Sequence, residues 1–385
     1  MNGEMDLKLL CLVLLIYAMS IGILGVTIPL YSDSLGADRM AIGFIVSAYA
    51  VAYVAASPLW GKASDRLGRK LALGIGMLMS SMIVPLFTFV SDPKLIVVIQ
   101  LLQGSAGASF WIVPTALIAD VYASRRMGEA LGKIAMFQGV GFIVGPLLGG
   151  FLVEQLNYPG VFYICSAFAF STALLVFFRL QEKPRVLNRG VKSSSKMGLK
   201  FGVRARRSLA IGYVYTIFSS VFFGVIESQF IVHAGEILGK EYLVGFLLAS
   251  YFMAETFTQP LAGRLSDIIG RHRTILLAFI MSALGFLTLV FPPSFVSLLI
   301  AVVAVGGGVG TLYVAPTALL MDVASPSRRG VISGFQNIAW GVGYFLGPML
   351  GGVAAIYSVS GPYILCIVAS AMGCTLSLVH TQSRV

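Results

Sequence analysis

Two carboxylates, Glu227 and Glu255, lie well within apolar stretches of the chain, and they are the residues whose type and position most clearly suggest chemistry. An acid at such depth has lost most of its hydration, so it faces a polar cavity, pairs with another group or stays protonated. No Lys or Arg lies inside these stretches as a partner. Both acids are therefore candidates for taking up and releasing a proton or for attracting a cationic substrate. A neutral Glu that hydrogen-bonds a neighbouring helix is the structural alternative.

Uncharged polar and aromatic residues in other apolar stretches are candidates for lining a cavity around these acids. The amides are Gln100 and Gln138, and the large aromatic side chains include Trp111 and Trp340. A mostly apolar, aromatic cavity with one or two acids suits bulky amphipathic or cationic compounds. We therefore assign these four residues, with the two acids, to substrate or proton binding.

The composition indicates what kind of scaffold holds these residues. Of the 385 residues, 57% are hydrophobic and only 11% are charged, and the mean hydropathy is +0.90. A soluble domain has about a quarter charged residues, so this chain lacks the charges to cover a soluble protein of its length. The sequence predicts an integral membrane protein.

Apolar stretches of roughly 20 residues predict twelve helical spans, at about residues 7–31, 40–60, 71–91, 94–118, 131–154, 158–180, 208–233, 241–262, 274–292, 294–320, 331–355 and 359–380.

The basic residues predict the orientation of these spans. Of the 27 Lys and Arg residues, 24 lie on the side of the two termini, and only Arg39, Lys94 and Lys240 lie on the other side. Cytoplasmic loops are enriched in Lys and Arg, so both termini are predicted to be cytoplasmic in a multi-pass protein of the plasma membrane. These clusters account for the net charge of +11 without a nucleic-acid partner. The basic segment 181–207 is predicted to link an N-terminal six-helix bundle, residues 1–180, to a C-terminal one, residues 208–385.

The second half of the chain repeats the first at an offset of 202 residues. The segment 139–150 reads GVGFIVGPLLGG and the segment 341–352 reads GVGYFLGPMLGG, and two further blocks around Pro58 and Pro114 recur in the same register at Pro260 and Pro316. Each half has six predicted spans, an even number, so the halves have the same orientation. Such parallel repeats place a substrate site near the bilayer midplane, between the halves.

A short loop between the second and third spans carries a pattern of Gly, Asp and Arg. It reads GKASDRLGRK from Gly61 to Lys70, and its counterpart reads GRLSDIIGRHR from Gly263 to Arg273. Gly61 and Gly68 permit a tight turn. An Asp at a helix end can pair with a nearby Arg or with a helix N-terminus, and such contacts can form in one conformation and break in another.

This loop closely resembles the signature loop of the major facilitator superfamily, and the resemblance covers the whole chain. In that family the Asp and Arg of the loop form a cytoplasmic charge network with an acidic residue that ends the fourth span, and this network stabilises the outward-facing state. The resemblance assigns that role to Asp65, Arg69 and Asp120 and, in the second half, to Asp267, Arg271 and Asp322. The alternative is that these ion pairs only tie helix ends together.

Two glycine-rich patterns refine the resemblance. The fifth span has Gly141, Gly145, Pro146 and Gly149, a pattern that looks like the motif of the family's exporters, especially drug–proton antiporters. The eleventh span repeats it at Gly343, Gly347 and Pro348, so close helix packing explains part of the pattern. The fourth span departs from the exporters, which usually have an Arg where this chain has Gln100, and this departure weakens the case for proton coupling by that route.

We therefore expect an all-α membrane protein of twelve helices in two pseudo-symmetric bundles, working as a secondary transporter by alternating access. The expected activity is proton-coupled efflux of small amphipathic or drug-like molecules. The expected partners are a small-molecule substrate, H+ as coupling ion and the lipid bilayer, and the chain is expected to act as a monomer. An uptake permease or facilitator for a small metabolite is the first alternative, and a membrane sensor with a transporter fold is the second.

Chemical conversion of the substrate is not expected. The spans offer neither an aspartate-rich metal pair nor a Ser–His couple at depth, since the Asp residues lie at loop edges and the sequence has only three histidines in all. The sequence also contains no ATP-binding loop of the Gly-Lys-Ser/Thr type. The chain is accordingly predicted not to be an enzyme, and no metal or cofactor is expected.

Overall fold

The computed structural model describes residues 7–122, 124–181, 202–291, 294–325 and 328–382, and within these ranges the chain forms helices and no strands. The part of the predicted linker from 182 to 201 lies outside the described residues. The helices of the first half are α1 (Leu7–Ser34), α2 (Arg39–Leu67), α3 (Arg69–Ile83) with the 3₁₀ segment η1 (Val84–Phe89), α4 (Pro93–Val121) and α5 (Ser124–Arg179). The helices of the second half are α6 (Val203–Val225), the π-helical segment η2 (Ile226–Phe230), α7 (Ile231–Leu238), α8 (Glu241–Ile268), α9 (Arg271–Thr288), α10 (Phe295–Asp322), α11 (Arg329–Tyr357) and α12 (Gly361–Gln382).

Each of the twelve predicted spans falls on these helices, but the helices do not correspond one to one with the predicted spans. Among the described residues, nine helices are long and apolar enough to cross a membrane. One of them, α5, contains two predicted spans, because the chain changes direction at Asn157, whose φ of 58° is the one non-helical conformation inside that element. The predicted spans 241–262 and 274–292 correspond to α8 and α9, which are not among the nine.

Local sequence signals explain where several helices begin. Asp38 caps α2 by accepting a hydrogen bond from the Ala41 amide at 2.7 Å, and Asp92 caps α4 in front of Pro93. Gly68 and Gly270 separate α2 from α3 and α8 from α9 with φ values of 99° and 93°. A residue with a side chain rarely adopts such a φ, so these glycines fix the sharp turn of each signature loop.

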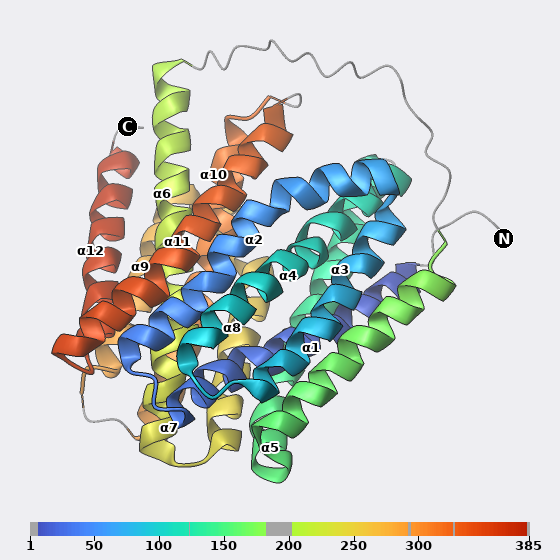
Figure 1. The fold of residues 1–385 in the computed structure, drawn as a ribbon. Coiled ribbons are helices and arrows are strands. Elements are labelled where there is room, and N and C mark those ends of the chain that lie inside the picture. Colours follow the sequence, from blue (N-terminus) through green and yellow to red (C-terminus); the bar gives the residue numbers. More distant parts are fainter. Residues whose placement is uncertain (1–6, 123, 182–201, 292–293, 326–327, 383–385) are drawn as a thin grey trace.

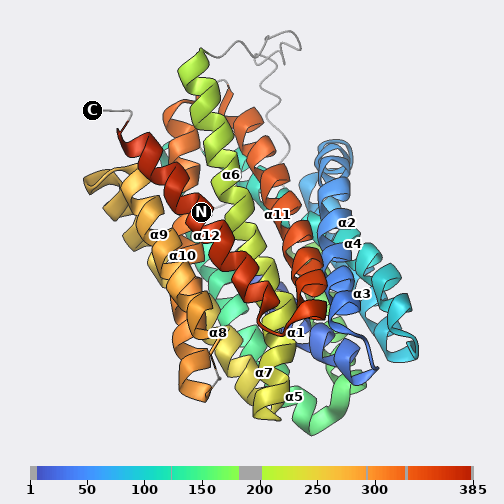
Figure 2. The ribbon, with the colours of Figure 1, turned by 90° about the vertical axis from the view of Figure 1, so that its left-hand side faces the viewer.

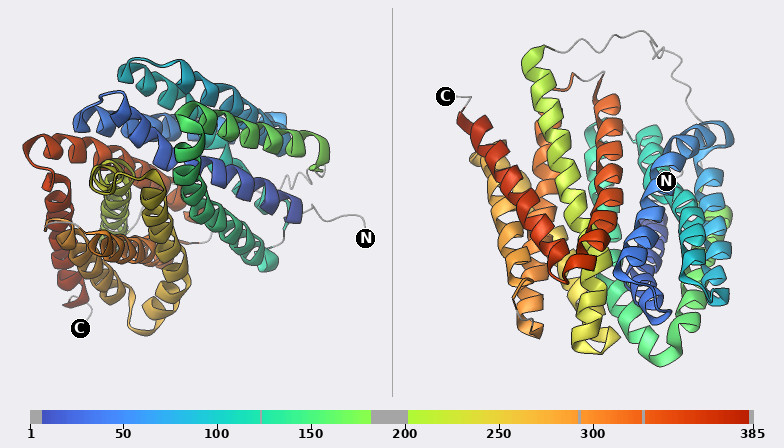
Figure 3. Two further views of the ribbon diagram at one scale, coloured as in Figure 1. Left: turned by 90° about the horizontal axis from the view of Figure 1, so that it is seen from below. Right: turned by 60° about the vertical axis from the view of Figure 1, so that its left-hand side comes forward.

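The helices lie in two groups that follow the order of the sequence (Figures 1 and 2). In the first half α1 packs on α5 and α2 on α4, and in the second half α6 packs on α11 and α8 on α10. The two groups meet where α2 packs on α11 and α5 on α8. Figure 3 shows that their ribbons approach each other at one end of the molecule and diverge toward the other.

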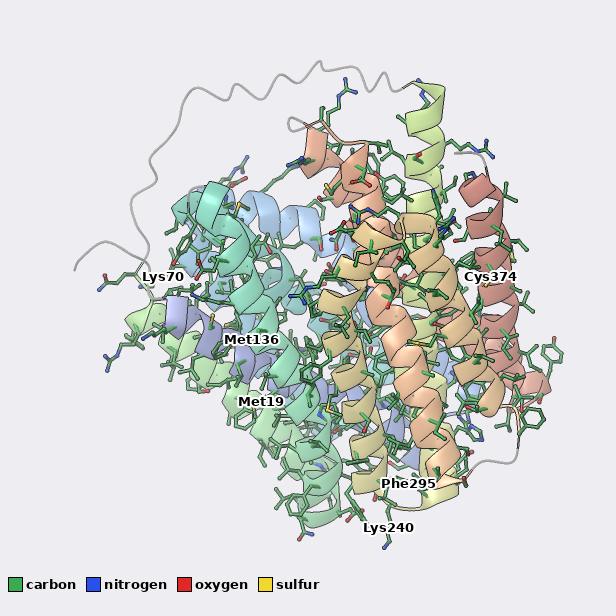
Figure 4. All side chains as sticks on the ribbon, turned by 180° about the vertical axis from the view of Figure 1, so that it is seen from behind. Met19, Lys70, Met136, Lys240, Phe295 and Cys374 are labelled. Atoms are coloured by element: carbon green, nitrogen blue, oxygen red, sulfur yellow. The ribbon has the colours of Figure 1, made fainter. Side chains whose placement is uncertain are left out.

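Lys70 and Lys240 mark these two ends in Figure 4. We call the end with the two signature loops, residues 61–70 and 263–273, the motif end, and the end with Lys240 the opposite end. The divergence of the ribbons is at the motif end (Figure 3).

The helix packing follows the repeat in the sequence. Gly22 lies against Pro146 in the first half, and Gly224, 202 residues later, lies against Pro348 in the second. The contacts between the halves are paired in the same way, because Gly43 abuts the carbonyl of Pro348 and Gly245 abuts that of Pro146. Residues that are 202 positions apart in the sequence therefore make equivalent contacts in the structure.

Candidate functional site

A small cavity lies between the two halves. Its volume is about 60 Å³, which is room for a few water molecules. The first half contributes residues of α1, α2 and α4, and the second half contributes one residue of η2 and one of α11. Glu227 is the one charged side chain among the described residues that line it. The lining residues are Ile21, Leu24, Gly25, Ile28, Pro29, Val46, Tyr49, Gln100, Gln103, Glu227 and Tyr344.

Glu227 reaches the cavity from the π-helical segment η2. A π-helical turn widens the helix by one residue and is often found at functional sites. The Tyr344 hydroxyl donates a hydrogen bond of 2.5 Å to Glu227 Oε2. Gly25 faces the same carboxylate, and a Cβ at that position would lie 3.6 Å from Glu227 Oε1. The absence of a side chain on Gly25 therefore leaves the space beside the acid open.

Two amides on one face of α4 complete the polar part of the cavity. Gln100 and Gln103 are one turn apart, and only 5% and 3% of their surfaces are exposed. Gln103 Nε2 donates to Ser80 Oγ at 2.7 Å, but the Oε1 atoms of both residues are buried and accept no hydrogen bond among the described residues. Gln100 was predicted as a site residue and Gln103 was missed, although its spacing of three residues from Gln100 in a helix signals a shared face.

Glu255, the second predicted acid, does not line this cavity. It lies on α8, partly buried, and its Oε2 atom is buried and accepts no hydrogen bond among the described residues. Its counterpart in the first half is Tyr53, whose hydroxyl donates to Asn337 Oδ1 at 2.7 Å across the two halves. Of the two acids, therefore, only Glu227 faces the cavity.

Aromatic rings form a layer next to the cavity, with members from both halves. Trp111 stacks on Phe142 with ring centroids 5.7 Å apart, and Phe142 stacks on Phe252 of the second half at 5.5 Å. Trp340 lies 5.0 Å from Tyr344, which is itself a cavity residue. Trp111 and Trp340 therefore belong to this aromatic layer and do not line the cavity.

Gln138, the remaining residue predicted to bind substrate or protons, does not line the cavity either. It lies on α5 and is partly exposed.

The predicted charge networks are assembled at the motif end, each within one half. Arg69 pairs with Asp65 at 2.8 Å and with Asp120 at 2.8 Å. Arg271 pairs in the same way with Asp267 at 2.5 Å and with Asp322 at 3.1 Å. The hydrogen bond to Asp322 raises the pKa of the Arg271 guanidinium above its ordinary value, so this side chain stays charged. The acids are 35–68% exposed but the two arginine side chains only 11% and 20%. Such half-exposed pairs contribute roughly 1 kcal/mol each, which is small enough for contacts that break and re-form.

The glycine-rich patterns hold helices at close range. Gly145 contacts α1, where a Cβ would lie 2.6 Å from the Met19 carbonyl oxygen, and Gly347 contacts α6 in the same way at Val221. The structure thus gives these motif glycines a packing role, which agrees with the alternative interpretation of the repeated pattern. Gly141 and Gly149 continue the contact with α1, and Gly343 continues that with α6. Gly61 was expected to permit the turn of the signature loop, but it lies inside α2, where its Cβ position faces open space, and Gly68 alone makes the turn.

Arg39 joins the two halves at the opposite end, a feature that was not predicted from the sequence. Its guanidinium pairs with Glu236 at 2.5 Å and donates to the Gln229 carbonyl at 2.9 Å, and the Gln229 amide donates back to the Arg39 carbonyl at 3.1 Å. The available signal was the presence of a basic residue on the side of the membrane with only three of them. We call these contacts of Arg39, Gln229 and Glu236 the Arg39 lock.

Comparison with known proteins agrees with this fold. The sequence profile of the Major Facilitator Superfamily matches residues 10–242 and 209–384. The chain is similar to Multidrug resistance protein 1 of Bacillus subtilis (strain 168), with 26% identity and 97% of each chain covered. It is also similar to the Multi-drug resistance efflux pump PmrA of Streptococcus pneumoniae serotype 4, with 24% identity over 92% of this chain and 90% of that protein. A crystal structure of a mutant of the nucleoside transporter NupG superposes with a TM-score of 0.81 at 16% identity, covering 96% of this chain and 99% of the other, and this likeness concerns the fold alone.

Proposed function

The chain belongs to the major facilitator superfamily, and we propose that, within this family of membrane transporters, it exports small amphipathic or drug-like molecules in exchange for protons. Members of the family are multi-pass membrane proteins that move small molecules, and they are not enzymes. The chain shares that general role, as its resemblance to multidrug resistance proteins over nearly its whole length supports. The direction of transport and the coupling to protons belong to the proposal.

The position of Glu227 carries this proposal. The carboxylate lies in a cavity between the halves, beside a layer of aromatic rings, and the described residues of the cavity lining include no basic side chain. A carboxylate in such a place is stable when it holds a proton or when a cation lies beside it. Exchange of one for the other on the same carboxylate would couple export to proton entry.

Alternating access requires that the cavity open to one side of the membrane at a time. We propose that residues 1–180 and 208–385 act as two bundles, that the segment 181–207 links them, and that the motif end is cytoplasmic. In the structure the Arg39 lock joins the two halves at the opposite end, and we propose that it holds this end closed. With this orientation the conformation described here is closed to the outside of the cell. We also propose that the protein works as a monomer, because one chain contains both bundles and the cavity between them.

The test is transport into inverted membrane vesicles that hold an imposed pH gradient. Glu227→Gln removes the titratable group while keeping its size, so we expect pH-driven uptake of a fluorescent amphipathic cation to be abolished. Glu129→Gln is the matched control, since Glu129 is exposed at the motif end and pairs with Lys133, and it should transport like the unmodified protein. Undiminished pH-driven uptake by Glu227→Gln would remove this residue from the mechanism.

Uptake or facilitated diffusion of a small metabolite is the second candidate. The observation that favours it is Gln100, an uncharged residue in the place where exporters of the family usually have Arg. The dependence of the transport rate on an imposed pH gradient distinguishes the two candidate functions. A facilitator moves substrate down its own gradient at the same rate with or without a pH gradient.

A further inference from the structure

We infer that the cavity beside Glu227 binds the protonated head group of a primary amine or of an amidine through N–H donors aimed at Glu227, Gln100 and Gln103. This inference rests on the proposed function and names the class of compound that the transporter selects. It excludes quaternary ammonium compounds as good ligands, because their cationic nitrogen has no N–H to donate.

The first argument is the set of acceptors around the cavity. Glu227 Oε2 accepts from Tyr344, which leaves Oε1 beside Gly25 for another donor. The Oε1 atoms of Gln100 and Gln103 accept no hydrogen bond among the described residues, although both side chains are more than nine-tenths buried. A buried acceptor without a donor costs free energy, and a primary ammonium or an amidinium has at least three N–H groups, which is enough donors for all three acceptors.

The second argument is the charge of the cavity. None of its eleven described lining residues is Lys, Arg or His, and Glu227 is the one acid among them, so an ionised Glu227 has no cation beside it from the lining. A carboxylate in this setting binds a cation in preference to a neutral or anionic group. Because Gln100 is uncharged, it does not compete with a cationic ligand for the carboxylate, as an Arg at the same position would.

The third argument is that these positions of the helix do not require a polar side chain. The residues equivalent to Gln100 and Gln103 in the second half are Val302 and Val305, which are fully buried on α10. The same helix position therefore accepts valine in one half and an amide in the other. The amides face the cavity that contains the acid, and the valines belong to an apolar core.

The size of the cavity sets how much of the ligand it holds. A volume of about 60 Å³ accommodates an ammonium or amidinium group but no aromatic ring. Tyr49 and Tyr344 line the cavity, and Tyr344 continues into the aromatic layer through Trp340 and Phe223. An amphipathic amine would thus place its head group beside Glu227 and its apolar body toward Tyr49 and Tyr344, the two aromatic residues that line the cavity.

The experiment measures binding of a matched pair of compounds to the purified full-length protein in lipid nanodiscs. The probes are phenylpropylamine and its N,N,N-trimethyl analogue, which differ only in their N–H donors and in the bulk of the head group. Quenching of tryptophan fluorescence is a suitable readout, because Trp340 lies against Tyr344. We expect the amine to bind at least about tenfold more tightly than the trimethyl compound.

Two variants test the assigned residues. Gln100→Val, which introduces the residue type found at the equivalent position of the second half, should weaken binding of the amine about tenfold and leave the affinity for the trimethyl compound unchanged. Gln155→Val, at an exposed position of α5, is the control and should change neither affinity. If Gln100→Val does not fold, Gly25→Ala tests the same site, because its methyl group would lie 3.6 Å from Glu227 Oε1 and reduce the space for the head group. It should then weaken binding of the amine.

Three outcomes would overturn the inference: equal affinities for the two compounds, an equal loss of both in Gln100→Val, or unchanged amine binding in Gly25→Ala. Displacement of the amine by Na+ at millimolar concentration, with no difference between the two compounds, would also overturn it and would assign the acceptors to a metal cation. Because binding is measured without a gradient, amine selectivity without export would refute the proposed direction of transport and leave the inferred ligand class intact.

Discussion

Glu227 and Gly25 are equivalent residues of the two repeats, and their difference gives the cavity its acid on one side only. The sequence identified Glu227, because an acid in an apolar stretch stands out by composition. It did not distinguish Glu227 from Glu255, and it did not identify Gln103 or Tyr344. Which side chains face the cavity depends on the rotation of each helix about its axis. The sequence of a span that is apolar on all sides carries little information on that rotation.

At the scale of a residue, the motif glycines make a prediction about stability. In Gly145→Ala the added Cβ would lie 2.6 Å from the Met19 carbonyl oxygen and 2.9 Å from Gly22 Cα, both backbone atoms. Such overpacking costs about 1–3 kcal/mol, so the melting temperature of the purified protein should fall. Gly132→Ala is the control, because no described atom outside its own helix turn lies within 4 Å of its Cβ position, and its melting temperature should stay the same or rise slightly. Equal melting temperatures of the two variants would contradict a packing role for Gly145.

At the scale of an element, the π-helical segment η2 links the cavity to the opposite end. Glu227 and Gln229 both lie in this five-residue segment, one in the cavity and the other bonded to Arg39. A movement of η2 that follows a change at the carboxylate would therefore also strain or release the Arg39 lock. The sequence predicted a single span over 208–233 and gave no sign of this segment, since a π-helical turn has no composition of its own.

Because the Arg39 lock joins the two halves, we predict that removal of the Arg39 side chain opens the opposite end. Ile42 is fully buried there, packed with Ala37 and Val232, so Ile42→Cys reports opening by its rate of reaction with a water-soluble maleimide after the native cysteines are replaced. Charge-assisted hydrogen bonds contribute roughly 1.5–3 kcal/mol, so Arg39→Ala should raise this rate about tenfold or more. The double variant Arg39→Glu with Glu236→Arg should restore part of the protection. A rate that Arg39→Ala leaves unchanged would show that the lock does not hold this end closed.

At the scale of the whole molecule, the ribbons of the two halves approach each other at the opposite end and diverge toward the motif end (Figure 3). Leu59 on α2 and Phe257 on α8 are each 64% exposed. The repeat in the sequence predicted two similar halves but not how they pack, and the structure shows that equivalent glycines face equivalent prolines. The repeat carried no information on which end is closed, since both conformations of such a transporter share one set of helices.

The charge networks at the motif end allow the last prediction. The ion pairs of Asp65 and Asp267 are already formed in the conformation seen here, in which the opposite end is closed. If they are stronger still in the conformation that is closed at the motif end, as the family resemblance implies, then Asp65→Asn should favour the conformation seen here. Exposed ion pairs contribute about 0–1 kcal/mol, so labelling of Ile42→Cys should slow by up to about fivefold, while labelling of Leu59→Cys should not slow. Asp267→Asn, which removes the equivalent acid of the second half, should act in the same direction because the halves are related by the repeat. Equal labelling rates in the unmodified background and in both variants would mean that these ion pairs only fasten helix ends within each half.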